Sequence, residues 1–175
     1  LGFRGLRVYA LYPDVFKTQL RALLRAAVYG DLRIMYPMVT SRREIEEIKQ
    51  RVSQTARELS EQGVAYKLPL QGAMIETPAA ALLSRELARL VDFFSIGTND
   101  LTQYTLALDR QNGELDRFDD PACEAVLALI KMTAENAHES GLEAGICGEL
   151  ASQPALLPKW SELGIDYLSV SPSVL

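Results

Sequence analysis

Hydrophobic and polar positions repeat along this chain with two different periods. Short apolar runs between turn residues are typical of buried strands, and they occur at residues 32–37, 70–75, 91–96, 142–146 and 167–170. The intervening segments carry apolar residues at helical spacing, which predicts helices over 13–29, 41–62, 78–90, 101–108, 119–141 and 154–163. We also expect a sixth strand near 7–10. This alternation predicts an α/β fold with a parallel sheet, either open or closed into a barrel.

Several helix ends carry recognisable capping signals. Ser41 followed by Glu44 has the pattern of a capping box, and Gly63 should end the helix that begins there. Thr77 is a suitable N-cap for the next helix, with Pro78 as its first residue. These signals place Glu76 at the carboxyl end of the strand at 70–75, just before a helix.

The length of the chain limits how much of a barrel it can form. A complete (β/α)₈ barrel needs eight strands and about 250 residues, whereas this chain has 175 residues. A TIM-type (β/α)₈ barrel would therefore be incomplete here, with N-terminal strands and the last helix missing. No linker or repeat interrupts the alternation, so we expect residues 1–175 to form a single partial barrel domain.

Composition and charge exclude several classes of function. The chain is 48% hydrophobic and carries a formal net charge of −5, which fits a globular domain and offers no basic face for nucleic acid. No apolar run approaches the roughly 20 residues that span a bilayer, so we expect no membrane insertion and a cytoplasmic location. The two cysteines, Cys123 and Cys147, are expected to be reduced, because a chain with this much core does not need a disulfide.

Polar side chains follow three successive predicted strands. Glu76 comes directly after the strand at 70–75, Asp100 lies in the Gly-Thr-Asn-Asp turn after 91–96, and Cys147 follows 142–146. Parallel α/β sheets and barrels build their active sites at the carboxyl ends of their strands. We therefore expect these three side chains to converge. Mg²⁺ is bound by one or two carboxylates plus substrate oxygens and water, which suits Glu76 and Asp100.

Five blocks of residues carry a family resemblance. They are Leu1-Gly2-Phe3-Arg4-Gly5-Leu6-Arg7, Ile34 to Met38, Met74 to Ala80, Phe93 to Arg110 and Cys147 to Ala151. In this order the chain resembles the phosphoenolpyruvate-utilising enzymes, whose C-terminal domain is a (β/α)₈ barrel. Within that family, the stretch from Thr102 to Arg110 and the Glu-Leu-Ala after Gly148 are most similar to Enzyme I of the sugar phosphotransferase system, the phosphoenolpyruvate-protein phosphotransferase. Pyruvate phosphate dikinase and phosphoenolpyruvate synthase are the related alternatives.

The resemblance implies a reaction and a role for each matching residue. The reaction is the Mg²⁺-dependent transfer of the phosphoryl group of phosphoenolpyruvate to a histidine, which releases pyruvate. The implied roles are metal binding by Glu76 and Asp100, substrate binding by Arg4, Asn99, Asp100 and Arg110, and donation of a proton to the enolate by Cys147. A thiol with a pKa near 8.5 is a plausible proton donor near neutral pH.

The resemblance also implies partners. The phosphoryl acceptor is a histidine on a separate N-terminal domain, which no part of this chain resembles, and the phosphate then passes to a histidine-containing phosphocarrier protein. Family members form homodimers through this domain, so a homodimer is expected. His138, the sole histidine, is interpreted as an exposed helix residue. The chain alone is expected to be inactive.

Two other classes of function stay open. The chain could be a non-catalytic barrel fragment that contributes only dimerisation or regulation. It could also be an aldolase- or lyase-type barrel that binds an acyl substrate through the same two carboxylates and Mg²⁺, although this gives no reason for Cys147 or for the phosphate arginines. Arg7 and Arg33 are left without an assigned role, because Arg33 begins its strand, away from the active end of a barrel.

Overall fold

The computed structural model describes residues 2–118, 120 and 122–174. Within this part of the chain, five parallel strands form one sheet in the order β1-β2-β3-β4-β5. The strands are β1 (Arg33–Tyr36), β2 (Leu70–Ile75), β3 (Phe93–Gly97), β4 (Glu143–Cys147) and β5 (Tyr167–Ser169). All five lie where the apolar runs predict them.

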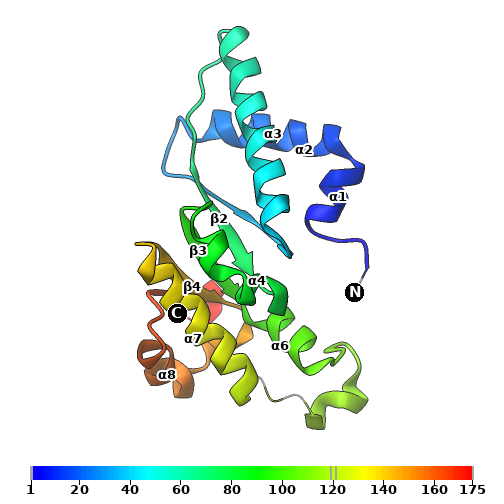
Figure 1. The fold of residues 1–175 in the computed structure, drawn as a ribbon, viewed down its shortest axis with the longest axis vertical. Helices are drawn as coiled ribbons and strands as arrows, with labels where there is room; N and C mark the ends of the chain where they lie inside the picture. Colours follow the sequence, from blue (N-terminus) through cyan, green and yellow to red (C-terminus); the bar gives the residue numbers. More distant parts are fainter. Residues whose placement is uncertain (1, 119, 121, 175) are drawn as a thin grey trace.

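Helices lie before the first strand and in every connection between strands (Figure 1). The α-helices are α1 (Leu6–Leu11), α2 (Pro13–Ala26), α3 (Arg42–Glu61), α4 (Pro78–Leu82), α5 (Ser84–Leu87), α6 (Thr98–Leu106), α7 (Glu124–Glu139) and α8 (Leu157–Glu162). Short 3₁₀ turns are η1 (Gly113–Phe118), η2 (Glu149–Ser152), η3 (Pro154–Leu156) and η4 (Pro172–Val174). In Figure 1, α1, α2 and α3 occupy the upper end of the molecule, and α6, α7 and α8 the lower end.

The sheet order selects between the two architectures that the sequence allows. Doubly wound sheets reverse their strand order at a switch point, whereas a barrel adds each new strand beside the previous one. Here each strand pairs with the next one along the chain, from β1 to β5. The fold is therefore of the barrel type, with five strands in the described part of the chain.

The two faces of the sheet carry different residues. Phe94 and Ile96 of β3 belong to the buried core, together with helix residues such as Ile45 of α3 and Ile130 of α7. The opposite face is crowded where large side chains lie over glycines. A Cβ atom added to Gly72 would lie 2.4 Å from the Phe93 ring, so this face, the interior side of a barrel, is packed by residues of neighbouring strands.

The expected strand near 7–10 is wrong, because these residues belong to α1. The helix begins after Gly5, which has a φ of 62°. Leu6 is buried, and the ring of Tyr9 stacks on that of Phe16 in α2 with centroids 4.3 Å apart. Leu6 and Tyr9 are three residues apart, so a helix directs both side chains to one face. The apolar pattern of this segment is too short to distinguish a helix from a strand, and the packing of this face favours the helix.

Several helix boundaries also differ from the prediction. The helix predicted over 78–90 is divided into α4 and α5 at Leu83, which has a ψ of 10°. The helix predicted over 154–163 begins as the 3₁₀ turn η3, and its α-helical part carries a proline at the start. The predicted start at 119–121 includes two residues outside the described part, and α7 begins at Glu124 with Cys123 as its N-cap. Cys123 is therefore a half-buried residue at the N-cap of α7.

The capping signals and both cysteines follow the prediction. The Ser41 hydroxyl accepts a hydrogen bond from the Glu44 backbone N–H, and the Glu44 carboxylate accepts one from the Ser41 backbone N–H. Thr77 caps α4, and Gly63 ends α3 with a φ of 66°. Cys123 and Cys147 are both free. In the described residues, no helix is both long and apolar enough to cross a membrane.

A contact between His138 and Asp166 joins the last turn of α7 to the beginning of β4 and β5. Nε2 of His138 lies 3.0 Å from Oδ2 of Asp166, which also accepts a hydrogen bond of 2.7 Å from the Ala144 backbone. Burial acts to raise the pKa of Asp166, but these two hydrogen bonds outweigh it and lower the pKa below the ordinary 3.8. The half-exposed His138 therefore has a structural contact at the start of the strands.

Replacing Asp166 by asparagine is expected to lower the free energy of unfolding at pH 7 by about 1 kcal/mol, since a hydrogen bond to a charged group is lost at a partly exposed site. Because the folded-state pKa is depressed, the carboxylate stabilises the fold above about pH 4 and loses this effect as pH falls through the lower folded-state pKa. The two proteins should thus converge in stability in acid. Urea unfolding between pH 7 and pH 2.5 measures this, and equal stability at pH 7 would contradict it.

Candidate active site at the carboxyl ends of the strands

The ends of β2 and β3 approach each other because Gly97 has no side chain. A Cβ atom at Gly97 would lie 2.9 Å from the Glu76 Cβ and 3.1 Å from its Oε2. Thr98 begins α6, and Asp100 therefore lies in the first turn of a helix, where a negative charge is favoured. The glycine thus brings the two predicted carboxylates, Glu76 and Asp100, to the same edge of the sheet.

Glu76 is a buried carboxylate with only 4% of its surface exposed. Its Oε1 accepts a hydrogen bond of 2.6 Å from the backbone N–H of Met38. Burial, and to a smaller extent the neighbouring Asp100, raise the pKa of Glu76 to about 7 against the lowering effects of the Met38 backbone and Arg4. The site therefore holds a carboxyl group whose charge is disfavoured until a cation neutralises it.

Met38 is held in an unusual backbone conformation to make this contact. Its φ is 55°, in the left-handed region that residues other than glycine seldom adopt. Gly5, with a φ of 62°, packs against it so closely that an added Cβ would lie 2.6 Å from the Met38 Cβ. The turn after β1 and the segment before α1 are thereby held together beside Glu76.

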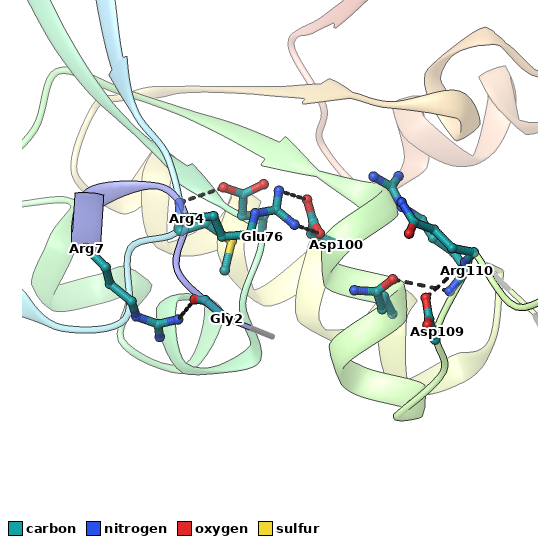
Figure 2. Close-up of polar contacts among 10 residues, drawn as sticks. Gly2, Arg4, Arg7, Glu76, Asp100, Asp109 and Arg110 are labelled. Carbon is teal, nitrogen blue, oxygen red and sulfur yellow. Dashed lines mark hydrogen bonds and ion pairs between the residues drawn. The ribbon is translucent and has the colours of Figure 1, made fainter. Parts of the chain in front are cut away.

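Arg4 lies between the two carboxylates (Figure 2). Its Nη1 and Nη2 donate hydrogen bonds of 2.9 and 3.0 Å to Oδ1 and Oδ2 of Asp100, a bidentate ion pair. The Asp100 side chain is 9% exposed and that of Arg4 is 44% exposed. The guanidinium therefore reaches a buried carboxylate from the solvent side.

Cys147 ends β4, and Gly97 is its register partner on β3. The Ser95 hydroxyl donates a hydrogen bond of 3.4 Å to the Cys147 Sγ, and the thiol donates one of 3.5 Å to the Ile96 carbonyl. Burial raises the pKa of this thiol, Ser95 opposes the rise, and the charge of Glu76 adds to it. The thiol consequently keeps its proton at neutral pH.

Asn99 and Thr98 hold the turn that follows β4. The Asn99 Oδ1 accepts a hydrogen bond of 3.0 Å from the Glu149 backbone, and the Thr98 hydroxyl donates one of 3.0 Å to the Cys147 carbonyl. Gly148, at a φ of 106°, has no room for a Cβ, which would lie 2.5 Å from the Thr98 hydroxyl. Asn99 thus positions the Cys147 turn in addition to its predicted contact with substrate.

Arg110 follows α6, on the other side of Asp100 from Arg4 in the view of Figure 2. Its backbone N–H donates a hydrogen bond of 3.2 Å to the Gln103 Oε1. Arg4 and Arg110 line one cavity of about 750 Å³ along the end of α6, and a second cavity of about 350 Å³ is lined by Asn99 and Arg110. The two predicted phosphate-binding arginines therefore share a cavity without contacting the same carboxylate.

The chain matches a known family along its whole length. The family model, described as "PEP-utilising enzyme, PEP-binding domain", covers residues 1–175. The chain belongs to the phosphoenolpyruvate-utilising enzymes. The resemblance stated from the five sequence blocks is confirmed by this match.

Curated relatives of this phosphoenolpyruvate-utilising domain carry the name phosphoenolpyruvate-protein phosphotransferase. Those of Bacillus sp. (strain S) and Geobacillus stearothermophilus are each 45% identical to the chain over 172 residues. That of Bacillus subtilis is 41% identical over 172 residues. Each match covers 98% of this chain and 30% of the relative. The chain therefore spans about a third of the length of these relatives.

Solved structures of other enzymes share the fold of the phosphoenolpyruvate-utilising domain. A citrate lyase from Burkholderia xenovorans has a TM-score of 0.67 at 20% identity, covering 90% of this chain and 51% of that chain. An HpcH/HpaI aldolase from Desulfitobacterium hafniense has a TM-score of 0.55 at 17% identity, covering 85% and 60%. These barrel-type neighbours support the fold that the sequence predicts. At such low identity they carry no argument for a lyase or aldolase activity.

Glu76 and Asp100 have the chemistry that Mg²⁺ prefers. Magnesium is typically bound through one or two carboxylates, with substrate oxygens and water completing an octahedron. The two carboxylates approach each other, and burial of Glu76 disfavours its charge unless a cation is present. Within the described ranges, no group of three or more His, Cys, Asp and Glu side chains is placed to hold a metal. The pair fits a hard cation that also takes ligands from a substrate.

Sequence reasoning missed residues that position the others. Met38 holds Glu76, Ser95 contacts Cys147, and Gln103 holds the backbone of Arg110. Met38 and Ser95 lie inside the blocks that carry the family resemblance, but nothing in their side chains indicates these contacts. The Met38 contact is made by a backbone N–H, which every residue except proline has, so the sequence holds no signal for it.

Proposed function

We propose that this domain binds phosphoenolpyruvate together with Mg²⁺ and acts as the substrate-binding part of a phosphoenolpyruvate-protein phosphotransferase. The observation that carries the proposal is that Arg4, Glu76, Asp100 and Cys147 meet at the carboxyl ends of β2, β3 and β4. The names of the relatives, at 41 to 45% identity, support the same activity. A purely structural barrel fragment has no physical need for this combination of groups.

The phosphate group would be bound by the two arginines. A planar guanidinium can donate two parallel hydrogen bonds to a phosphate, and Arg4 and Arg110 line the same cavity of about 750 Å³. Asn99 lines the adjoining cavity and uses its Oδ1 toward Glu149, which leaves its amide N–H groups to bind substrate oxygens. Glu76 and Asp100 would hold Mg²⁺, which when bound neutralises charge on the transferred phosphoryl group.

Cys147 would donate the proton that converts the enolate into pyruvate. Departure of the phosphoryl group leaves the electron pair of the broken P–O bond on the enol oxygen, and the terminal carbon of the resulting enolate then takes a proton. The buried thiol stays protonated at neutral pH because its pKa is raised. Ser95 holds the sulfur in place and can stabilise the thiolate that forms.

The acceptor and the later partners would lie outside this chain. We expect the phosphoryl group to pass to a histidine of an N-terminal domain and then to a histidine-containing phosphocarrier protein for sugar uptake. The match covers 30% of the relative's length, and such a domain would correspond to part of the remainder. We also expect a homodimer in the cytoplasm.

Calorimetric titration of the chain with phosphoenolpyruvate, with and without MgCl₂, tests the proposal. We expect binding that depends on Mg²⁺ and saturates at one ligand per chain. A folded chain, verified by circular dichroism, that binds no phosphoenolpyruvate at millimolar concentration in the presence of MgCl₂ would contradict the assignment of the site to these residues.

A further inference from the structure

Two predicted roles compete for the same pair of side chains. Asp100 is predicted to bind the metal and Arg4 to bind the phosphate, yet in the structure they bind each other. Both oxygens of Asp100 accept hydrogen bonds from Arg4, at 2.9 and 3.0 Å. While this pair persists, both terminal nitrogens of Arg4 and both oxygens of Asp100 are engaged, so neither group can offer its ligand its full set of contacts.

The guanidinium occupies the place where a cation is needed. It lies beside Glu76 as well as Asp100 (Figure 2) and donates a hydrogen bond to each Asp100 oxygen. Two ionised carboxylates that approach each other in a buried site are stabilised by a positive charge nearby. Arg4 supplies that charge from within the chain.

The pair can open without unfolding its surroundings. Asp100 is fixed in the first turn of α6, whereas Arg4 lies in the segment before α1 and its side chain is 44% exposed. The backbone of that segment is anchored by the packing of Gly5 on Met38. A rotation of the Arg4 side chain alone would release both Asp100 oxygens and the two guanidinium N–H groups that bind them.

We infer that Arg4 is an internal substitute for the divalent cation, and that it leaves Asp100 and turns to the phosphate when the cation binds. This inference rests on the proposed function. The cation and the phosphate ligand should then bind with positive coupling, because each takes one half of an ion pair that already exists. The guanidinium competes with the cation only while no phosphate is present.

The coupling can be measured by calorimetry on the whole chain. We expect phosphoenolpyruvate to tighten the binding of MgCl₂ by about tenfold or more, with the reciprocal effect of MgCl₂ on phosphoenolpyruvate equal in size. Inorganic phosphate, used as a second probe, should show coupling of the same sign. Coupling below about twofold in the unmodified protein would overturn the inference.

The Arg4→Gln variant tests whether the ion pair itself, rather than any nearby positive charge, weakens the binding of MgCl₂. Without any phosphate ligand, this variant should bind MgCl₂ about fivefold more tightly or better than the unmodified protein, and its coupling to phosphoenolpyruvate should fall to less than about threefold. Arg110→Gln is the matched control. It removes the same charge from the same cavity without touching Asp100, so its affinity for MgCl₂ alone should stay within about twofold.

Three results would overturn the inference. The first is a MgCl₂ affinity of Arg4→Gln that is unchanged or weaker, the second is an equal gain in Arg110→Gln, and the third is absence of MgCl₂ binding in all three proteins. The arm without phosphate does not involve phosphoenolpyruvate, so it can support or reject the role of Arg4 even if the proposed function fails. A failure of the proposed function would instead appear as absence of phosphoenolpyruvate binding by the unmodified protein.

Discussion

Replacing Cys147 by alanine is expected to slow the exchange of pyruvate methyl protons with solvent deuterium by about 10²- to 10⁴-fold, the range contributed by a positioned general acid or base. The group that protonates the enolate carbon must remove the same proton in the reverse direction. Burial keeps the thiol protonated for the forward step, and the Ser95 hydroxyl, which donates a hydrogen bond to the sulfur, can stabilise the thiolate that removes the proton in reverse. Proton NMR of pyruvate in D₂O with MgCl₂ measures the exchange rate.

The second cysteine provides a control for this prediction. Cys123 is the N-cap of α7 and is free like Cys147, so Cys123→Ala should exchange at the rate of the unmodified protein. Pyruvate must be shown to bind the Cys147 variant, because a loss of binding would also slow exchange. An unchanged exchange rate in the Cys147 variant would show that another group handles the proton.

Replacing Asp100 by asparagine is expected to weaken the Mg²⁺-dependent binding of phosphoenolpyruvate by about 100-fold or more, which corresponds to about 2.7 kcal/mol. The substitution removes a hard anionic ligand from the turn that Gly97 brings against Glu76. It also frees Arg4, whose two hydrogen bonds go to this carboxylate. Binding without Mg²⁺ should therefore not fall, and calorimetry with and without MgCl₂ measures both quantities.

Asp14→Asn is the matched control for the Asp100 substitution. It makes the same chemical change in the first turn of another helix, α2, and should leave both affinities unchanged. Retention of full Mg²⁺-dependent binding by the Asp100 variant would remove this residue from the metal site. It would also leave the ion pair with Arg4 as a purely structural contact.

The positions of the five strands along the chain could be predicted from the sequence, because each is a short apolar run between turn residues, whereas their order in the sheet was decided by the structure. Glu76, Asp100 and Cys147 could likewise be placed at strand ends, since a parallel sheet gathers those ends at one edge. The strand expected near 7–10 was wrong because its pattern is too short to distinguish a two-residue period from a helical one. Only packing of Leu6 and Tyr9 against the rest of the chain made it a helix.

The sequence by itself determined which chemical groups this domain carries and where most of its strands and helices lie along the chain. Local periodicity and turn residues suffice for this because they are properties of neighbouring positions. Only the tertiary structure decided which groups contact each other. Arg4 and Asp100 are separated by 96 positions, and Glu76 is held by a backbone N–H of Met38. Contacts between distant segments depend on the close approach that Gly5 and Gly97 allow. Local periodicity cannot predict that approach, because it describes only neighbouring positions.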